Sequence, residues 1–127
     1  MGIGNAKVAI DRPADEVWAV VGDFGGIGEW MPGIDSCRVE GDDRIIETMG
    51  MTITEHLVKK DDTARALTYS IVEGAPVERH EAVVTVTPDG AGSVVTWDVD
   101  AEPDDMAGLM GTVYQGALDA LKVHVEG

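Results

Sequence analysis

Three residues, Glu55, Tyr69 and His80, could do acid–base chemistry on a predicted sheet face that is otherwise apolar. Burial in an apolar pocket raises the pKa of a carboxyl group, which suits a general acid or base near neutral pH. His80 could act as a second base or orient a carbonyl group, and Tyr69 could hydrogen-bond a developing enolate oxygen. Together these side chains predict an aldol-type cyclisation or a dehydration that needs no cofactor.

The same residues also have purely structural interpretations. Glu55 could form a buried ion pair with Arg44 that sets the register of two strands. One register at the turn of residues 49–50 brings Arg44 opposite Glu55, and the other brings Ile45, so both stay open. His80 could be a histidine at the pocket rim, bonded to Glu78 or to water.

These positions depend on six strands predicted between residues 34 and 101, where β-branched and apolar residues alternate with polar ones. The strands are IDSCRVEG, RIIETM, TITEHLVKK, RALTYSIVE, VERHEAVVTVT and SVVTWDVDA, and the short turns between them predict an antiparallel meander. Cross-strand partners share a face. The expected pairs are Val86 with Val95, Val84 with Trp97, Ala82 with Val99, His80 with Ala101, Leu67 with Val84, Tyr69 with Ala82, and Ile71 with His80.

Helices are expected on both sides of the meander. A short strand at residues 5–10 precedes a helix at residues 11–24, and GEWMPG allows one further short turn. From Met106 to Val125, apolar residues follow helical spacing for five turns. Gly108, Gly111 and Gly116 each weaken this helix by about 1 kcal/mol relative to Ala, so we expect it to be supported by packing on the sheet.

The inward face of sheet and helix predicts the wall of a ligand pocket. Its aromatic members could stack on a flat ligand, and its methionines could adapt to varied apolar shapes. The candidate ligand-binding residues are Trp30, Arg44, Ile53, Leu57, Leu67, Ile71, Trp97, Val99, Met106, Met110 and Tyr114.

Composition excludes several other functions. The net charge of −15 argues against nucleic acid and against an anionic membrane surface, and no apolar run is long enough to span a membrane. The three histidines lack ligand spacing, so neither a metal nor a cofactor is expected. A single cysteine, Cys37, and no visible signal peptide favour a cytoplasmic protein, as a monomer or homodimer.

The order of elements and several segments resemble a known superfamily. The segments are RPADEVWAVVGDF, EWMPGI, RIIETMGMTITEHL, LTYSIVEGAPV and VTVTPDGAGSVVTWDVDAEP. They resemble the START-like, or Bet v 1-like, helix-grip superfamily in its polyketide cyclase/dehydrase (SRPBCC) branch. The resemblance implies one α+β domain over residues 1–127. A curved antiparallel sheet of about seven strands would wrap around a long C-terminal helix, with one or two short helices after the first strand.

The resemblance also implies a cavity between sheet and helix, because the superfamily includes aromatic cyclases, lipid carriers and plant abscisic acid receptors. The expected ligand is a small hydrophobic molecule, such as an aromatic or polyketide-like one. The protein would be a cyclase or dehydratase, a carrier or sensor, or a co-chaperone-like interaction module. Glu55 matches a cavity glutamate of the receptor branch, and His80 stands where many relatives have a pocket tyrosine. Residues 48–52 and 74–77 match the receptors' gate and latch loops but lack their motifs.

Overall fold

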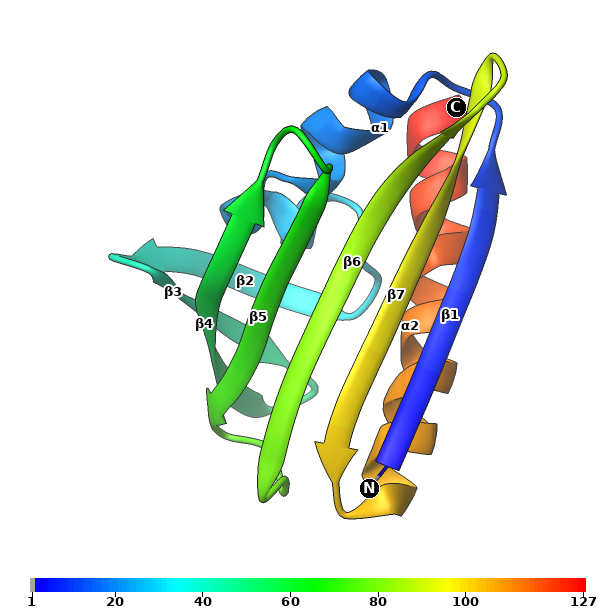
Figure 1. Cartoon of the computed structure of the whole chain (residues 1–127). Helices are drawn as coiled ribbons and strands as arrows, with labels where there is room; N and C mark the ends of the chain where they lie inside the picture. The colour runs from blue at the N-terminus through cyan, green and yellow to red at the C-terminus, as the bar shows by residue number, and fades with distance from the viewer. Residues whose placement is uncertain (1) are drawn as a thin grey trace.

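The computed structural model describes residues 2–127, which form one antiparallel sheet of seven strands curved around a long helix (Figure 1). The strand order is β1-β7-β6-β5-β4-β3-β2. This arrangement confirms the helix-grip fold. The elements are β1 (Gly2–Ile10), α1 (Ala14–Val21), the 3-10 helix η1 (Phe24–Glu29), β2 (Ile34–Glu40), β3 (Asp43–Thr48), β4 (Met51–Asp61), β5 (Ala66–Glu73), β6 (Arg79–Asp89), β7 (Gly92–Glu102) and α2 (Asp104–Glu126).

The register predicted from alternation is confirmed along the centre of the sheet. All four expected pairs between β6 and β7 are present, from Val86 with Val95 to His80 with Ala101. Leu67 faces Val84 and Tyr69 faces Ala82, as expected. Beyond Tyr69 the β5–β6 ladder ends, and the Ile71 backbone N–H instead donates to Nδ1 of His80 at 3.0 Å.

The start of the chain differs from the sequence-based expectation at three boundaries, one of which is the start of the first helix, at Ala14 rather than residue 11. β1 begins at Gly2 rather than at residue 5, and it pairs with β7 along its whole length. The first helix ends at Val21 rather than Phe24, because the chain becomes extended at Asp23, with φ −80° and ψ 91°. Phe24 then opens the separate 3-10 helix η1.

Helix α2 packs on the concave face of the sheet through small and apolar residues at helical spacing. It lies closest to β1, where a Cβ added to Gly111 would come within 3.2 Å of the backbone nitrogen of Asn5. A Cβ added to Gly4 would collide with the carbonyl oxygen of Ala107. Small residues on both elements therefore permit a close approach of helix and strand, which is the support that the glycine-containing helix requires.

Two of the three helix glycines have no such role, and this yields a stability prediction. Nothing lies within 4 Å of a Cβ added to Gly108 or Gly116. Gly108→Ala and Gly116→Ala should each raise the free energy of unfolding by about 1 kcal/mol, because alanine has the higher helix propensity. Thermal or urea unfolding measures the change. Gly4→Ala is the contrasting variant, and stabilisation by that substitution would contradict the close packing described above.

Side chains of α2 also bind the backbone of β1 along its outer edge. The amide of Gln115 accepts from the Lys7 backbone N–H at 3.0 Å and donates to the Lys7 carbonyl oxygen at 2.9 Å. About two turns further on, Lys122 Nζ donates to the carbonyl oxygen of Ala9 at 2.9 Å. The helix thus satisfies edge groups that a neighbouring strand would otherwise bond.

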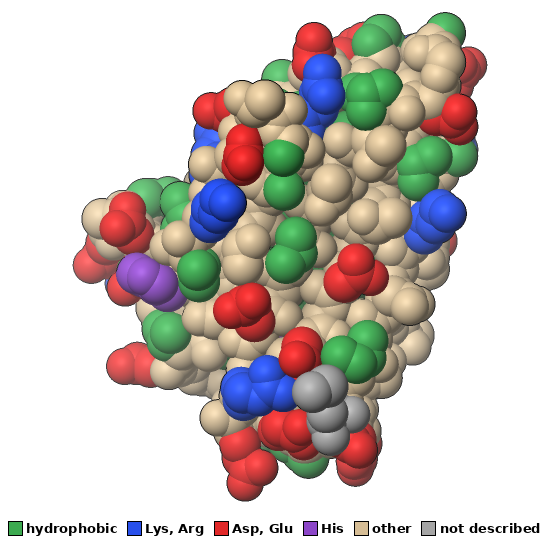
Figure 2. All heavy atoms as spheres, viewed as in Figure 1, with side chains coloured by type: hydrophobic (Ala, Val, Ile, Leu, Met, Phe, Trp, Pro, Cys, Tyr) green, Lys and Arg blue, Asp and Glu red, His purple; other side chains and the backbone are tan. Residues whose placement is uncertain are grey.

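The acidic residues lie mostly on the surface and in turns. Figure 2 shows acidic side chains spread over the outer face and the ends of the molecule, among exposed apolar and a few basic ones. Among residues 2–127, the buried Asp, Glu, Lys, Arg and His side chains are Arg44, Glu55 and His80. The large negative charge therefore lies outside the core, and Glu55 is the buried carboxyl group.

Candidate functional site

A cavity of about 400 Å³ lies between the concave sheet face, α2 and the loops at one end of the molecule. Glu55 and Tyr69 reach it from β4 and β5, so two of the three candidate catalytic side chains share one cavity. Six of the predicted ligand-binding residues also line it: Ile53, Ile71, Trp97, Met106, Met110 and Tyr114. Apart from Glu55 and Thr48, the lining is apolar or aromatic.

Arg44 and Glu55 form a buried ion pair beside this cavity. The structure pairs Arg44 with Glu55 across β3 and β4, which resolves the open choice between Arg44 and Ile45. Arg44 donates to Glu55 Oε1 from Nε at 2.7 Å and from an Nη atom at 2.6 Å, and to the Phe24 carbonyl oxygen at 2.9 Å. Its guanidinium carbon lies 4.1 Å from the ring centroid of Phe24 and 4.8 Å from that of Tyr69.

This environment has opposing effects on the ionisation of Glu55. Burial raises the pKa of Glu55, while the charge and hydrogen bonds of Arg44 lower it. The net direction is a raised pKa, which favours the proton exchange expected of a general acid or base. Both Arg44 nitrogens contact Oε1 of Glu55. The structure is therefore compatible with both interpretations of Glu55, the structural ion pair and the general acid or base.

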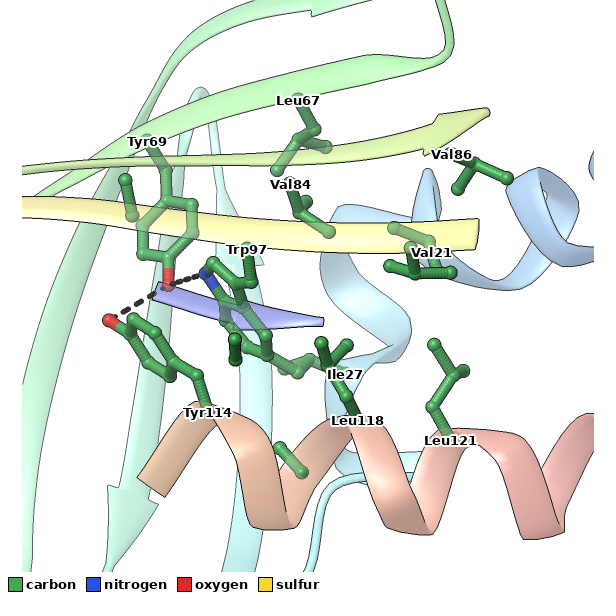
Figure 3. Close-up of a cluster of buried hydrophobic side chains, with 14 of the residues drawn as sticks. Val21, Ile27, Leu67, Tyr69, Val84, Val86, Trp97, Tyr114, Leu118 and Leu121 are labelled. Atoms are coloured by element: carbon green, nitrogen blue, oxygen red, sulfur yellow. Dashed lines mark hydrogen bonds between the residues drawn. The ribbon is translucent and has the colours of Figure 1, made fainter. Parts of the chain in front are cut away.

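The hydroxyl groups of Tyr69 and Tyr114 meet beside Glu55, inside a cluster of aromatic rings. Trp97 donates from Nε1 to the Tyr69 hydroxyl at 3.1 Å, and the Tyr69 and Tyr114 hydroxyl oxygens lie 3.1 Å apart (Figure 3). The rings of Trp97 and Tyr114 stack with centroids 4.0 Å apart and planes 2° from parallel. We call Glu55, Tyr69, Trp97 and Tyr114 the cavity floor.

His80 lies behind the cavity floor rather than in the cavity wall. Its Nδ1 accepts from the Ile71 backbone N–H, and its Nε2 lies 3.2 Å from the Tyr114 hydroxyl. Burial lowers the pKa of His80 to about 4. Because Nδ1 is an acceptor, the neutral ring carries its hydrogen on Nε2 and donates to Tyr114. No lone pair of His80 is left to accept a proton from a ligand, so its role here is to hold Tyr114.

Five predicted ligand-binding residues lie outside the cavity, which corrects the expected wall. Arg44 and Leu67 border a separate void instead of the cavity, and Leu57 packs against the hydrophobic core (Figure 3 labels Leu67). Trp30 borders the same void, of about 10 Å³, and packs against Trp97 with ring centroids 6.2 Å apart. Val99 is covered where Gly4 of β1 meets α2.

The sequence reasoning missed the wall formed by η1, β2 and β3. Ile27 and Met31 line the cavity from η1 and the turn after it, and Ile46 lines it from β3. Ile46 carried a usable signal, because it lies two residues after Arg44 and so faces the same side of β3. Ile27 lies in a Gly-rich stretch whose turns give no periodic pattern, so no signal identified it.

Two further sequence expectations concern a membrane and a metal. Within residues 2–127, no helix is both long and apolar enough to cross a membrane. The same part of the chain holds no group of three or more His, Cys, Asp or Glu side chains placed to bind a metal ion.

A comparison of the sequence with models of known families identifies the family to which the protein belongs. A family model described as "Polyketide cyclase / dehydrase and lipid transport" matches residues 2–126. The chain belongs to this family. A search of curated proteins finds no match. Membership agrees with the START-like, SRPBCC resemblance of the sequence, and a family that joins cyclases to lipid carriers is consistent with a cavity for hydrophobic ligands.

Solved structures of relatives share the fold over nearly the whole chain. XoxI from Bacillus cereus is 27% identical with a TM-score of 0.93, and the match covers 99% of this chain and 96% of that one. A START superfamily protein from Mycobacterium smegmatis is 17% identical, with a TM-score of 0.85 and coverage of 99% and 98%. The di-domain aromatase/cyclase BexL of the BE-7585A biosynthetic pathway is 24% identical, with a TM-score of 0.81 and coverage of 99% and 47%. The last two establish the fold alone.

Proposed function

We propose that the protein binds one small, uncharged, largely apolar molecule in the cavity above the floor of Glu55, Tyr69, Trp97 and Tyr114. The observation that carries this proposal is a cavity of about 400 Å³ with an almost wholly apolar wall. Pockets that bury drug-sized ligands begin at about 300 Å³ and combine apolar walls with a few polar groups. A cavity of this size also favours ligand binding over a purely protein-binding module, for which a filled core is expected.

The surroundings of the cavity support an uncharged ligand. The charge of Glu55 is balanced by Arg44 at hydrogen-bond distance, so the floor offers no free ionic partner to a charged group. The protein's net charge of −15 disfavours the approach of anions. At the mouth, four lining residues with exposed apolar side chains give an apolar ligand a path from the surface: Met49, Met51, Leu109 and Val113.

A second candidate function is cofactor-independent cyclisation or dehydration of such a ligand. It is favoured by Glu55 and Tyr69 lining the same cavity, and by a family that includes polyketide cyclases. In this version Glu55 removes a proton next to a ligand carbonyl, Tyr69 binds the enolate oxygen, and His80 positions the phenols. Glu55→Gln should abolish turnover while sparing binding. Unchanged turnover would remove Glu55 from the mechanism.

Binding can be tested with an uncharged fluorescent probe, N-phenyl-1-naphthylamine. We expect saturable binding to the wild-type protein at a single site. Met110→Trp should weaken it by at least tenfold, because the larger ring occupies space that the ligand needs. Fluorescence titration measures the dissociation constant.

The matched control is Val123→Trp, a substitution on the same helix at a side chain that is 72% exposed and does not line the cavity. It should bind the probe like the wild type. Equal loss in both variants, or no loss in Met110→Trp with an unchanged thermal unfolding temperature, would contradict binding in this cavity.

A further inference from the structure

The side chains at the cavity floor and His80 form a hydrogen-bond network that has one more donor hydrogen than it has bonds. Four groups carry a hydrogen: Trp97 Nε1, His80 Nε2 and the hydroxyls of Tyr69 and Tyr114. They make three contacts: Trp97 with Tyr69 at 3.1 Å, Tyr69 with Tyr114 at 3.1 Å, and His80 with Tyr114 at 3.2 Å. Each contact uses one hydrogen, so four donors share three bonds.

The position of the surplus hydrogen follows from the direction of the outer two bonds. Trp97 Nε1 is a donor only, and the hydrogen of the His80 ring is on Nε2 because the Ile71 N–H occupies Nδ1. Both therefore donate inward, to the phenol oxygens. Whichever phenol donates to the other, one phenol O–H remains. Both phenols line the cavity, so this hydrogen has the cavity in reach.

The surplus O–H is held in place rather than free to seek another partner. Tyr69 and Tyr114 are 1% and 6% exposed, and Tyr114 is stacked on Trp97. Across residues 2–127, the hydrogen bonds of the two phenol oxygens are those to each other, to Trp97 and to His80. A ligand that covered this O–H without offering an acceptor would leave a buried donor unpaired, at a cost of about 1–3 kcal/mol. A ligand that supplies the acceptor avoids this cost and meets a group whose oxygen is already positioned.

We propose that the cavity selects ligands that present a neutral carbonyl oxygen to the Tyr69–Tyr114 hydroxyl pair. This inference rests on the proposed binding function and specifies its chemistry. A carbonyl oxygen accepts without donating, which matches a floor that has one hydrogen too many. A carboxylate would also accept, but it would bring an unpaired charge into an apolar cavity of a protein with net charge −15. An aryl or alkyl ketone, aldehyde or ester fits both conditions.

The test uses two planar probes of nearly the same shape, 2-acetylnaphthalene and 2-isopropenylnaphthalene, which differ in C=O against C=CH₂. We expect the ketone to bind about tenfold more tightly than the alkene, which is the effect of one hydrogen bond. Either single Tyr→Phe substitution leaves the other phenol with a hydrogen that the network does not use. Removing both phenols would free the indole N–H of Trp97, which also lines the cavity. The informative variant therefore combines Tyr69→Phe and Tyr114→Phe with Trp97→Phe, and in it the ketone preference should fall to about equal binding.

A second readout does not depend on that variant folding. The carbonyl stretching frequency of ¹³C-labelled 2-acetylnaphthalene, bound to the wild-type protein, should lie below its value in hexane because of a hydrogen bond from a phenol. Equal affinity of the two probes in the wild type, or a hexane-like frequency in the bound ketone, would overturn the proposal. Binding of N-phenyl-1-naphthylamine to a separate portion of the same protein preparation separates this result from failure of the cavity itself to bind.

Discussion

Arg44→Met is expected to lower the free energy of unfolding by about 3–5 kcal/mol, the cost of leaving one partner of a buried ion pair uncompensated. Arg44 and Glu55 are 3% and 7% exposed, so little solvent reaches the carboxylate to replace the lost guanidinium. The substitution also removes the bond from Arg44 to the Phe24 carbonyl oxygen and the cation–π contacts with two rings. Urea unfolding followed by circular dichroism measures the loss.

The matched variant is Arg44→Met combined with Glu55→Leu, which removes both charges. It should recover most of the lost stability, because an apolar pair of similar volume avoids the desolvation of either ion. About 1 kcal/mol should stay lost, since the Phe24 carbonyl oxygen has no new donor. A single Arg44→Met variant within 1 kcal/mol of the wild type would show that the pair does not hold β3 against β4.

The second large expected effect is a loss of folding stability in acid that is caused by the protonation of His80. Its pKa is about 4 in the folded protein against an ordinary 6.5, so the unfolded chain binds the extra proton first as pH falls. Stability from this group is complete above pH 6.5 and is lost as pH falls toward 4. The loss amounts to at most about 3 kcal/mol.

His80→Asn isolates this contribution, because the asparagine oxygen can still accept from the Ile71 N–H. The carboxyl groups of Asp61, Asp100 and Glu126 have lowered pKa values and also destabilise the fold in acid, but they are common to both proteins. The difference in unfolding free energy between wild type and variant, measured from pH 7 to pH 4, should therefore shrink as pH falls. A difference that stays constant with pH would mean that His80 titrates normally.

Alternation predicted the centre of the sheet but not the β3–β4 hairpin. On β6 and β7, a strict apolar stripe permits one register, since a slip of one residue would turn every buried side chain outward. The β3–β4 register depends instead on the turn between them. In the structure Thr48 pairs with Met51, and Met49 and Gly50 form the turn with φ of 50° and 76°. A methionine in the left-handed region is uncommon, so its type gave no indication of the two-residue turn.

The sequence predicted which face of the sheet carries the candidate site, but not how far the cavity extends along that face. Strand alternation placed Glu55, Tyr69 and His80 on the inward face, and the structure places all three there. Strand alternation does not indicate where the cavity ends along that face. Leu67 and Trp97 were therefore both predicted to bind the ligand, although only Trp97 lines the cavity. Cavity depth depends on how far α2 lies from each strand, and that spacing follows from packing such as the Gly4–Gly111 approach.

The hydrogen bonds from α2 to the outer edge of β1 bear on the tendency of this protein to aggregate at high concentration. An open strand edge is a template on which identical chains can stack into intermolecular β-structure. Gln115 binds Lys7 as a partner strand would, through one donor and one acceptor, and Lys122 occupies the carbonyl oxygen of Ala9. Besides covering the concave face, the long helix is therefore expected to hinder pairing of this strand edge with a second molecule, the first step toward a fibril.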